Sequence, residues 1–269
     1  MIDKMREFFE REPPKRSVNL NKNVVLYLEN ISVSFDGFKA IDALNLYVMK
    51  NELRCIIGPN GAGKTTMMDI ITGKTRPNSG SAWLGQNFNL LLHSEDQIAR
   101  AGVGRKFQKP TVFENLTVIE NLELAMDTDK RVFQTLFAKP NRLEDESIKV
   151  VLKKINLTDL RNESAGSLSH GQKQWLEIGM LLMQNAQLLL IDEPAAGMTH
   201  QEMEKTVELL IALKDKHTII VVEHDMDFVR ALESPVTVLH QGKVLAQGNM
   251  NEIQNDPKVV EVYLGEKND

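Results

Sequence analysis

The chain of 269 residues has a single cysteine and no apolar run approaching about 18 residues. One cysteine excludes an internal disulfide framework and fits a reducing compartment. That residue, Cys55, lies within an aliphatic run, so we expect a small core residue rather than a reactive thiol. The lack of a long apolar run predicts no membrane-spanning helix, and the charged start Met1–Glu7 lacks a signal-peptide core. We expect a cytosolic protein unless a partner holds it elsewhere.

The chain also lacks a basic excess, because its net charge is −5 and its pI is about 5.8. This balance argues against nucleic acid as the main partner. Two small basic clusters, Lys15-Arg16 and Arg105-Lys106, are expected on the solvated surface. At ~150 residues per domain, the length predicts two compact units or one large domain with an insert.

A glycine-rich phosphate-binding loop (P-loop) is present at Gly58–Thr65, which reads G-P-N-G-A-G-K-T. The run Leu53–Ile57 before it predicts a buried strand, and Thr66–Ile71 after it has helical spacing. Backbone N–H groups of such a loop point at phosphates, while the lysine adds charge and the threonine hydroxyl can bind Mg²⁺. The residues expected to bind nucleotide here are Gly58, Pro59, Asn60, Gly61, Ala62, Gly63, Lys64, Thr65 and Thr66, with Thr65 also a metal ligand.

The remaining pattern predicts an α/β fold with a mostly parallel core sheet. Strands Val24–Leu28, Ile31–Phe35 and Ala43–Met49 are expected to form an antiparallel subdomain before the P-loop. Residues 1–22 look like an N-terminal extension, residues 23–269 form the main domain, and about 110–167 make a helical insert. The aliphatic runs Gln187–Ile191 and Thr218–Val222 predict central parallel strands.

Asp192-Glu193 follows the first of these aliphatic runs. A carboxylate at the carboxyl end of a parallel strand lies at the crevice where ligands bind. There Asp192 can hold Mg²⁺, directly or through water. Glu193 is expected to face a different direction and to address an attacking water.

Residues Leu168–Gln172 read L-S-H-G-Q and lie roughly 20 residues before Asp192. Here the chain resembles the ATP-binding-cassette (ABC) family, whose signature is L-S-G-G-Q. The match extends to Gln108 as the Q-loop glutamine, to Asp192-Glu193, and to His224 as the switch histidine, and it covers about residues 24–265. The resemblance implies the P-loop ABC ATPase fold and hydrolysis of ATP with Mg²⁺.

The resemblance further implies a head-to-tail dimer. Each ATP would lie between one subunit's P-loop and the other's signature residues Ser169, His170, Gly171 and Gln172. Glu193 would polarise the water, His224 would hold the γ-phosphate and water, and Gln108 would contact Mg²⁺ and report nucleotide state to the insert. Phe35 matches the family's adenine-stacking aromatic, although an ordinary strand aromatic explains its spacing equally well.

Two residues depart from the family pattern. His170 replaces the first glycine of the signature and adds a titratable group near the phosphate. Thr199 stands where many members have an aspartate, which puts the usual cross-dimer carboxylate contact in doubt.

Within the family, Gly104–Val118 and Pro194–Thr199 resemble importers of the branched-chain amino acid class. The run Val33–Ala40 is closer still to the ATPases of urea and short-chain amide importers. These resemblances imply a peripheral subunit on the cytoplasmic face of the membrane. Its partners would be permease subunits, a second ATPase subunit and, indirectly, a substrate-binding protein, with no nucleic acid. A permease helix would dock near Gln108–Thr117. A branched-chain amino acid importer and a non-transport ABC regulator remain alternatives.

Overall fold

The computed structural model describes residues 18–20, 23–106, 111–126 and 142–265. Most of the predicted N-terminal extension and Gln108 therefore lie outside the described residues. The strands are β1 Val24–Phe35, β2 Phe38–Met49, β3 Leu53–Ile57, β4 Ser79–Leu84, β5 Phe88–Asn89, β6 Val103–Lys106, β7 Leu188–Asp192, β8 Thr218–Val222, β9 Val236–His240 and β10 Lys243–Gly248. The helices are α2 Lys64–Ile71, α3 Glu95–Arg100, α4 Val118–Ala125, α6 Arg142–Lys154, α7 His170–Met183, α8 His200–Leu213, α9 Met226–Ala231, α10 Met250–Asn255 and α11 Pro257–Gly265.

The central sheet has the strand order β10-β9-β3-β8-β7-β6 and is parallel except for β10. Its strands β3, β7 and β8 are rich in aliphatic residues and almost completely buried, because α7 and α8 cover one face while α2 and strands β1, β2 and β4 cover the other. Alternate residues belong to different cores: Leu189 and Ile191 face α7 and α8, while Leu188 and Leu190 share a core with α2. The predicted parallel core is confirmed.

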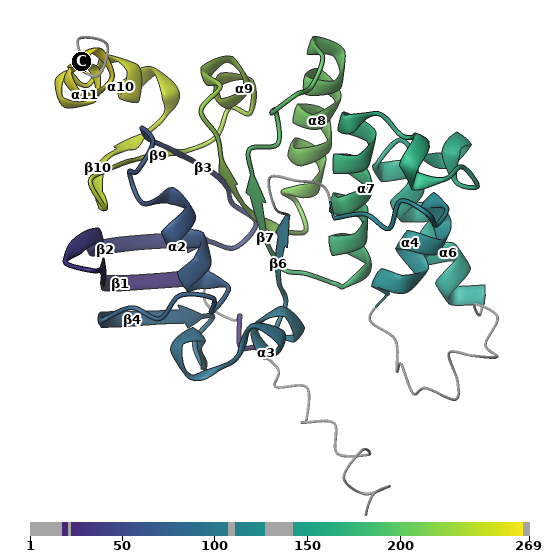
Figure 1. The fold of residues 1–269 in the computed structure, drawn as a ribbon, viewed down its shortest axis with the longest axis horizontal. Helices are drawn as coiled ribbons and strands as arrows, with labels where there is room; N and C mark the ends of the chain where they lie inside the picture. The colour runs from purple at the N-terminus through teal and green to yellow at the C-terminus, as the bar shows by residue number, and fades with distance from the viewer. Residues whose placement is uncertain (1–17, 21–22, 107–110, 127–141, 266–269) are drawn as a thin grey trace, which may run out of the picture.

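The second sheet is antiparallel, with the order β2-β1-β4-β5 (Figure 1). Its buried side packs with α2 against the central sheet. The sequence divided β1 into two strands and started β2 at Ala43, and both predictions were wrong. β1 continues through Asn30, whose φ of 51° lies at a shift in register, and β2 begins at Phe38 directly after a two-residue turn.

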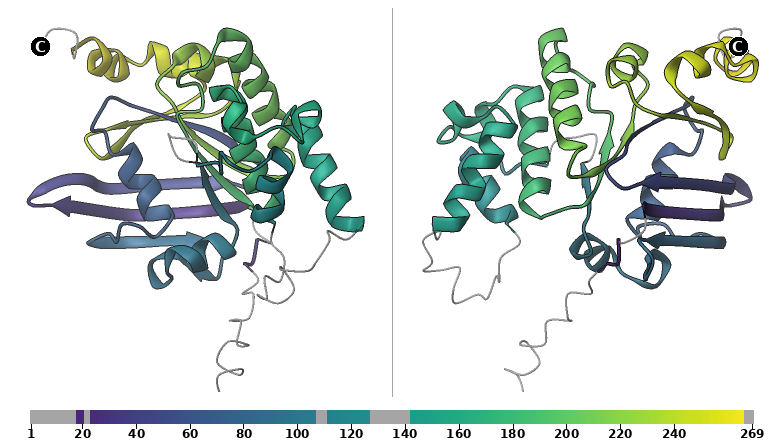
Figure 2. Two further views of the ribbon diagram at one scale, coloured as in Figure 1. Left: turned by 45° about the vertical axis from the view of Figure 1, so that its right-hand side comes forward. Right: turned by 180° about the vertical axis from the view of Figure 1, so that it is seen from behind.

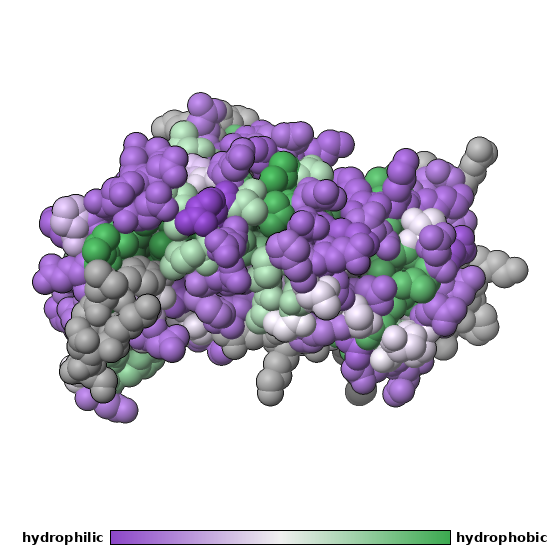
Figure 3. All heavy atoms as spheres, turned by 90° about the horizontal axis from the view of Figure 1, so that it is seen from above, coloured by the Kyte–Doolittle hydropathy of each residue, from purple (hydrophilic) through white to green (hydrophobic). Residues whose placement is uncertain are grey.

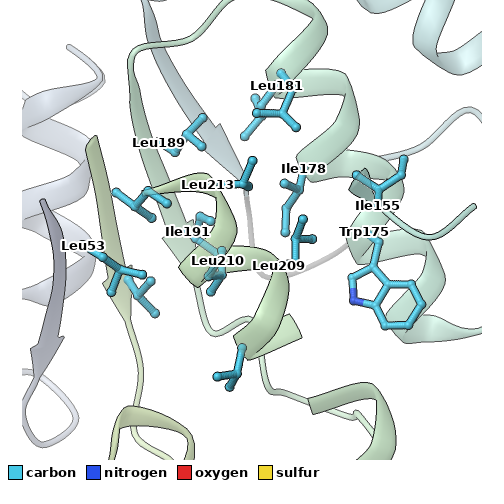
Figure 4. Packing of buried hydrophobic residues seen from close by; sticks show 14 of the residues in the cluster. Leu53, Ile155, Trp175, Ile178, Leu181, Leu189, Ile191, Leu209, Leu210 and Leu213 are labelled. Atoms are coloured by element: carbon cyan, nitrogen blue, oxygen red, sulfur yellow. The ribbon is translucent and has the colours of Figure 1, made fainter. Parts of the chain in front are cut away.

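A group of helices lies on the opposite side of the molecule from the antiparallel sheet (Figures 1 and 2). α4 begins with a capping box formed by Thr117 and Glu120, and α4 and α6 both pack against α7. Figure 4 shows Ile155, which directly follows α6, beside Trp175 and Ile178 of α7, with Leu209, Leu210 and Leu213 of α8 between α7 and the sheet. α7 thus joins the helical group to the central sheet.

The surface seen from above is mostly hydrophilic, with small hydrophobic areas between polar side chains (Figure 3). In the described part of the chain, no helix is long and apolar enough to cross a membrane. Cys55 is buried in β3, and burial raises the pKa of its thiol to about 12. The prediction of a small core residue is confirmed.

Candidate nucleotide-binding site

The P-loop joins the end of β3 to the start of α2, as the sequence predicted. Gly58 has a φ of 153°, and a Cβ there would meet the Leu239 carbonyl oxygen at 2.2 Å. Any side chain at this position therefore collides with the backbone of β9. The loop needs glycine here because it passes so close to the neighbouring strand.

α2 begins at Lys64, two residues before the start that the sequence predicted. Its N-cap is Gly63 in the left-handed conformation, and no side chain caps the helix. The first N–H groups of the helix are thus left for an anion. Lys64 bends back over the loop, and its Nζ donates to the carbonyl oxygens of Gly58 at 2.6 Å and Pro59 at 2.9 Å. These contacts hold the ammonium group beside the loop's backbone donors, while Thr65 is exposed at the helix start.

The start of β2 and the turn between β9 and β10 both contact the P-loop. A Cβ on Gly63 would lie 2.7 Å from the Ala40 carbonyl oxygen, so the start of β2 touches the P-loop. The turn between β9 and β10 adds a hydrogen bond from Gly242 N to the Ala62 carbonyl.

Two exposed aromatic residues lie at the β1–β2 turn, next to the start of β2 that contacts the P-loop. Phe35 is 49% exposed, and Phe38, which pairs with it, is 67% exposed. An exposed aromatic pair thus lies at this end of the site, and the sequence interpretation had considered only Phe35.

Asp192 ends β7 and is nearly buried, next to two cationic side chains. Arg105 Nη2 lies 3.3 Å from Asp192 Oδ2, and its other terminal nitrogen bonds Asp69 of α2. Lys106 is only 1% exposed, and its Nζ lies 3.4 Å from the Asp192 carbonyl oxygen. The prediction that Arg105-Lys106 is solvated surface was wrong, because buried carboxylates gather around both cations.

Burial sets the ionisation of this cluster. It raises the pKa of Asp192, an effect that Arg105 opposes. Burial lowers the pKa of Lys106, against the attraction of the Glu177, Asp192, Glu223 and Glu193 carboxylates. The cluster therefore contains charges that are offset largely by one another rather than by water.

Glu193 and His224 come together at the ends of neighbouring strands β7 and β8. His224 Nδ1 lies 3.8 Å from Glu193 Oε1. The His224 side chain is 65% exposed and that of Glu193 is 28% exposed, so both side chains can reach a ligand. Glu193 has a φ of 47°, a left-handed conformation that turns it away from the direction of Asp192. The two residues that were predicted to handle water and γ-phosphate are thus adjacent.

Glu223 holds these two strand ends together, and sequence reasoning missed it. This buried carboxylate accepts N–H groups from Ala195 at 2.8 Å, His224 at 2.7 Å and Asp225 at 3.0 Å. It thereby links the loop after Glu193 to the loop that contains His224. The available signal was its position directly after the buried run of β8.

The signature segment (Leu168–Gln172) forms the N-terminus of α7. Ser169 is the N-cap, as predicted, and exchanges capping-box hydrogen bonds with Gln172. The Ser169 hydroxyl donates to Glu202 Oε1 of α8 at 2.6 Å. His170 Nε2 lies 2.8 Å from Nε2 of Gln174, which also donates to the Ala196 carbonyl. The segment is therefore bonded to residues 195–202, where the sequence departs from the family pattern.

A cavity of about 390 Å³ lies between α3, β6 and α7. Its lining includes Arg105, Lys106, Thr111, Glu177, Met180 and Gln184. Thr111 is fixed there because its N–H and hydroxyl both donate to Glu177 Oε1, at 2.6 and 2.7 Å. The cavity thus adjoins both ends of the segment 107–110, which contains Gln108.

Comparison with known proteins identifies the family. Residues 41–196 match the model of the ABC transporter family. The chain belongs to the ABC transporter family. Residues 243–268 of this ABC ATPase also match the model described as branched-chain amino acid ATP-binding cassette transporter. The protein is therefore an ATP-binding, ATP-hydrolysing cassette of that class.

Individual relatives agree over nearly their whole length. The ABC ATPase is 35% identical over 252 residues to BraF of Pseudomonas aeruginosa, a high-affinity branched-chain amino acid transport ATP-binding protein. The aligned residues cover 90% of this chain and 98% of BraF. LivG of Escherichia coli K12 is 35% identical over 251 residues, with the same coverage. The ADP conformation of the cassette MJ1267 matches this structure with a TM-score of 0.79 at 30% sequence identity. The match covers 91% of this chain and 100% of the MJ1267 chain. A dimeric cassette bound to ADP and phosphate has a TM-score of 0.69 at 26% identity, covering 84% and 98%. The predicted fold is confirmed.

Proposed function

We propose that this ABC ATPase powers an importer by hydrolysing ATP between two subunits. In one subunit, Gly58–Thr66 hold the phosphates through backbone N–H groups and Lys64. Phe35 stacks on the adenine at the edge of the site. Glu193 orients the attacking water, and His224 binds beside it. The observation that carries the proposal is that Glu193 and His224 meet at the strand ends.

Mg²⁺ fits the oxygen atoms that this site offers. Among the described residues, no hydrogen bond uses Asp192 Oδ1, and the Thr65 hydroxyl is exposed at the start of α2. Hydroxyl and carboxylate oxygens together with phosphates are the ligands that Mg²⁺ prefers in such sites. We assign Thr65, Asp192 and Gln108 as its protein ligands. When bound, the ion neutralises phosphate charge.

A second subunit completes the site in this proposal. α2 and α7 pack on opposite faces of the central sheet, so the signature segment does not cover its own subunit's P-loop. Ser169, His170, Gly171 and Gln172 would instead meet the γ-phosphate bound to the partner. A related cassette forms a dimer, which supports this arrangement. The partner is a second copy or a sister ATPase.

The helical group transmits closure of the dimer to a permease. The insert at about residues 110–167 moves with nucleotide state. The cavity beside Thr111 receives a cytoplasmic helix of the permease. The protein then works at the cytoplasmic face of the membrane as a peripheral subunit. A substrate-binding protein acts with the complex from the other side.

The relatives favour a branched-chain amino acid as the transported substrate. They support it better than urea or short-chain amides, for which the only support is the sequence of Val33–Ala40. Uptake of labelled leucine and labelled urea by cells that lack this subunit separates the two substrates. Loss of leucine uptake alone supports the amino acid assignment, and loss of urea uptake alone overturns it.

Glu193→Gln tests the hydrolytic role. The amide keeps the size of the side chain but cannot act as a base, so ATP binding should persist while turnover falls by about 10²-fold or more. Phosphate release and binding of a fluorescent ATP analogue measure the two properties.

Glu233→Gln is the matched control, since Glu233 also has a left-handed backbone, with a φ of 46°, but is exposed beyond α9. It should hydrolyse ATP at the normal rate. Normal turnover in Glu193→Gln would contradict the assignment.

A further inference from the structure

Glu202, on the first turn of α8, binds two helix N-termini at once. Its Oε2 accepts the N–H of Thr199 at 3.0 Å and the Thr199 hydroxyl at 2.9 Å, which completes the capping box of α8. Its Oε1 accepts the Ser169 hydroxyl at 2.6 Å, at the N-cap of α7. One carboxylate therefore connects the loop after the β7 carboxylates to the signature segment.

The Ser169 hydroxyl has no proton free while these contacts hold. It gives its only proton to Glu202 and accepts the N–H of Gln172 at 3.2 Å. A hydroxyl in this state has no proton left for a phosphate oxygen. Ser169 can donate to a γ-phosphate only after its bond to Glu202 breaks.

The carboxylate also occupies the space in front of α7. A Cβ on Gly171 would lie 2.7 Å from Glu202 Cδ and 2.8 Å from its Oε1, so the acid packs directly against the signature backbone. The N-terminus of a 14-residue helix attracts negative charge. In the free subunit, Glu202 thus supplies the anion at a place where the proposed function puts a phosphate.

We propose that Glu202 is a positioning residue that must withdraw from Ser169 for the partner's ATP to bind there. In the free subunit its carboxylate holds the Ser169 hydroxyl, and the incoming γ-phosphate displaces it. This inference rests on the proposed function, in which Ser169 meets the ATP of the second subunit. Because Glu202 is also bonded to Thr199, its withdrawal carries the arrival of ATP to the loop that follows Glu193.

A separate contact keeps the two segments together when Glu202 leaves. Gln174 is buried in α7 and bonds both His170 and the carbonyl of Ala196. A Cβ on Gly197 would lie 3.3 Å from the His170 ring, so the loop also packs on that side chain. The attachment of the loop to α7 therefore does not depend on the charge of Glu202.

The test measures ATP-driven dimerisation of the full chain by sedimentation, with Mg²⁺ and in a Glu193→Gln background that prevents turnover. Glu202→Gln keeps an oxygen acceptor and the side chain's size but removes the charge. The ATP concentration for half-maximal dimerisation should fall about fivefold, because the hydrogen bond from Ser169 to a neutral amide is weaker than that to a carboxylate and so costs less to break.

Glu208→Gln is the matched control, because it makes the same charge change at an exposed position on α8. It should leave the half-maximal ATP concentration unchanged. In the chain with Glu193 intact, Glu202→Gln should lower KM for ATP more than it changes kcat, whereas a residue that only caps α8 would alter thermal stability and leave KM unchanged. Equal half-maximal concentrations for Glu202→Gln and Glu208→Gln would overturn the inference.

Ser169→Ala separates this inference from the proposed function. If Ser169 meets the partner's ATP, this variant needs more ATP to dimerise. Dimerisation that is indifferent to Ser169→Ala would overturn the composite site itself. A clear effect of Ser169→Ala with none from Glu202→Gln would overturn only the role of Glu202.

Discussion

Around Asp192, individual buried side chains compensate the charges of one another in place of water. Lys106 and Arg105 lie at the end of β6, and the carboxylates that they balance come from α2, α7, the end of β7 and the residues directly after β7 and β8. A buried cation with several acidic neighbours is costly to remove, because the acids are then left without compensation. Sequence could not show this, since a basic dipeptide is buried only when the fold brings distant acids to it.

Lys106→Met should lower the free energy of unfolding by about 3 kcal/mol, because it removes the buried cation and leaves the carboxylates. Urea denaturation measures the change. Lys149→Met is the control, since Lys149 forms an exposed ion pair with Glu146 at 2.9 Å and should cost less than ~1 kcal/mol. Equal losses in the two variants would contradict the structural role of the buried lysine.

Among the elements, those defined by local patterns were predicted well and those defined by distant partners were not. The P-loop, the capping of α7 by Ser169 and the aliphatic strand β7 are all encoded in a few consecutive residues. The continuity of β1 depends on its pairing with β2 and β4, which the residues near Asn30 do not show. Glu223 and Glu202 were missed for the same reason, because their partners lie on other elements.

The P-loop itself depends on the strand beside it. Gly58→Ala should cost about 3 kcal/mol or more of unfolding free energy, because the new Cβ would meet a backbone oxygen of β9 at 2.2 Å. Gly61→Ala should cost only ~1 kcal/mol, since Gly61 has a φ of 77° but nothing within 4 Å of the added carbon. Chemical denaturation of the pair measures the difference, and a Gly61 variant as unstable as the Gly58 variant would show that backbone conformation alone matters.

The whole molecule has two cores that share the central sheet. The antiparallel sheet and α2 lie on one face, and α7, α8 and the helical group lie on the other. The candidate site lies at the carboxyl ends of the strands, where the sequence placed the P-loop and Asp192. Glu177 is buried on α7, and its Oε2 has no hydrogen-bond partner among the described residues.

Glu177 should make the stability of the whole molecule depend on pH. Burial raises its pKa above 4.5, so between that value and the raised one the folded state binds more protons than the unfolded state. Its contribution therefore weakens the fold as pH rises through this range. Glu177→Gln can still accept from Thr111 but does not ionise, so its unfolding free energy should fall less between pH 4.5 and 7.5. Parallel denaturation series test this, and identical slopes would contradict it.

Glu223 also has a consequence for how the chain can vary in length. Its one carboxylate accepts N–H groups from the loop after β7 and from the loop after β8. An inserted or deleted residue in either loop shifts those donors and leaves a buried acid without partners. The spacing from Asp192 to Ala195 and the spacing from Glu223 to Asp225 therefore both have to be kept.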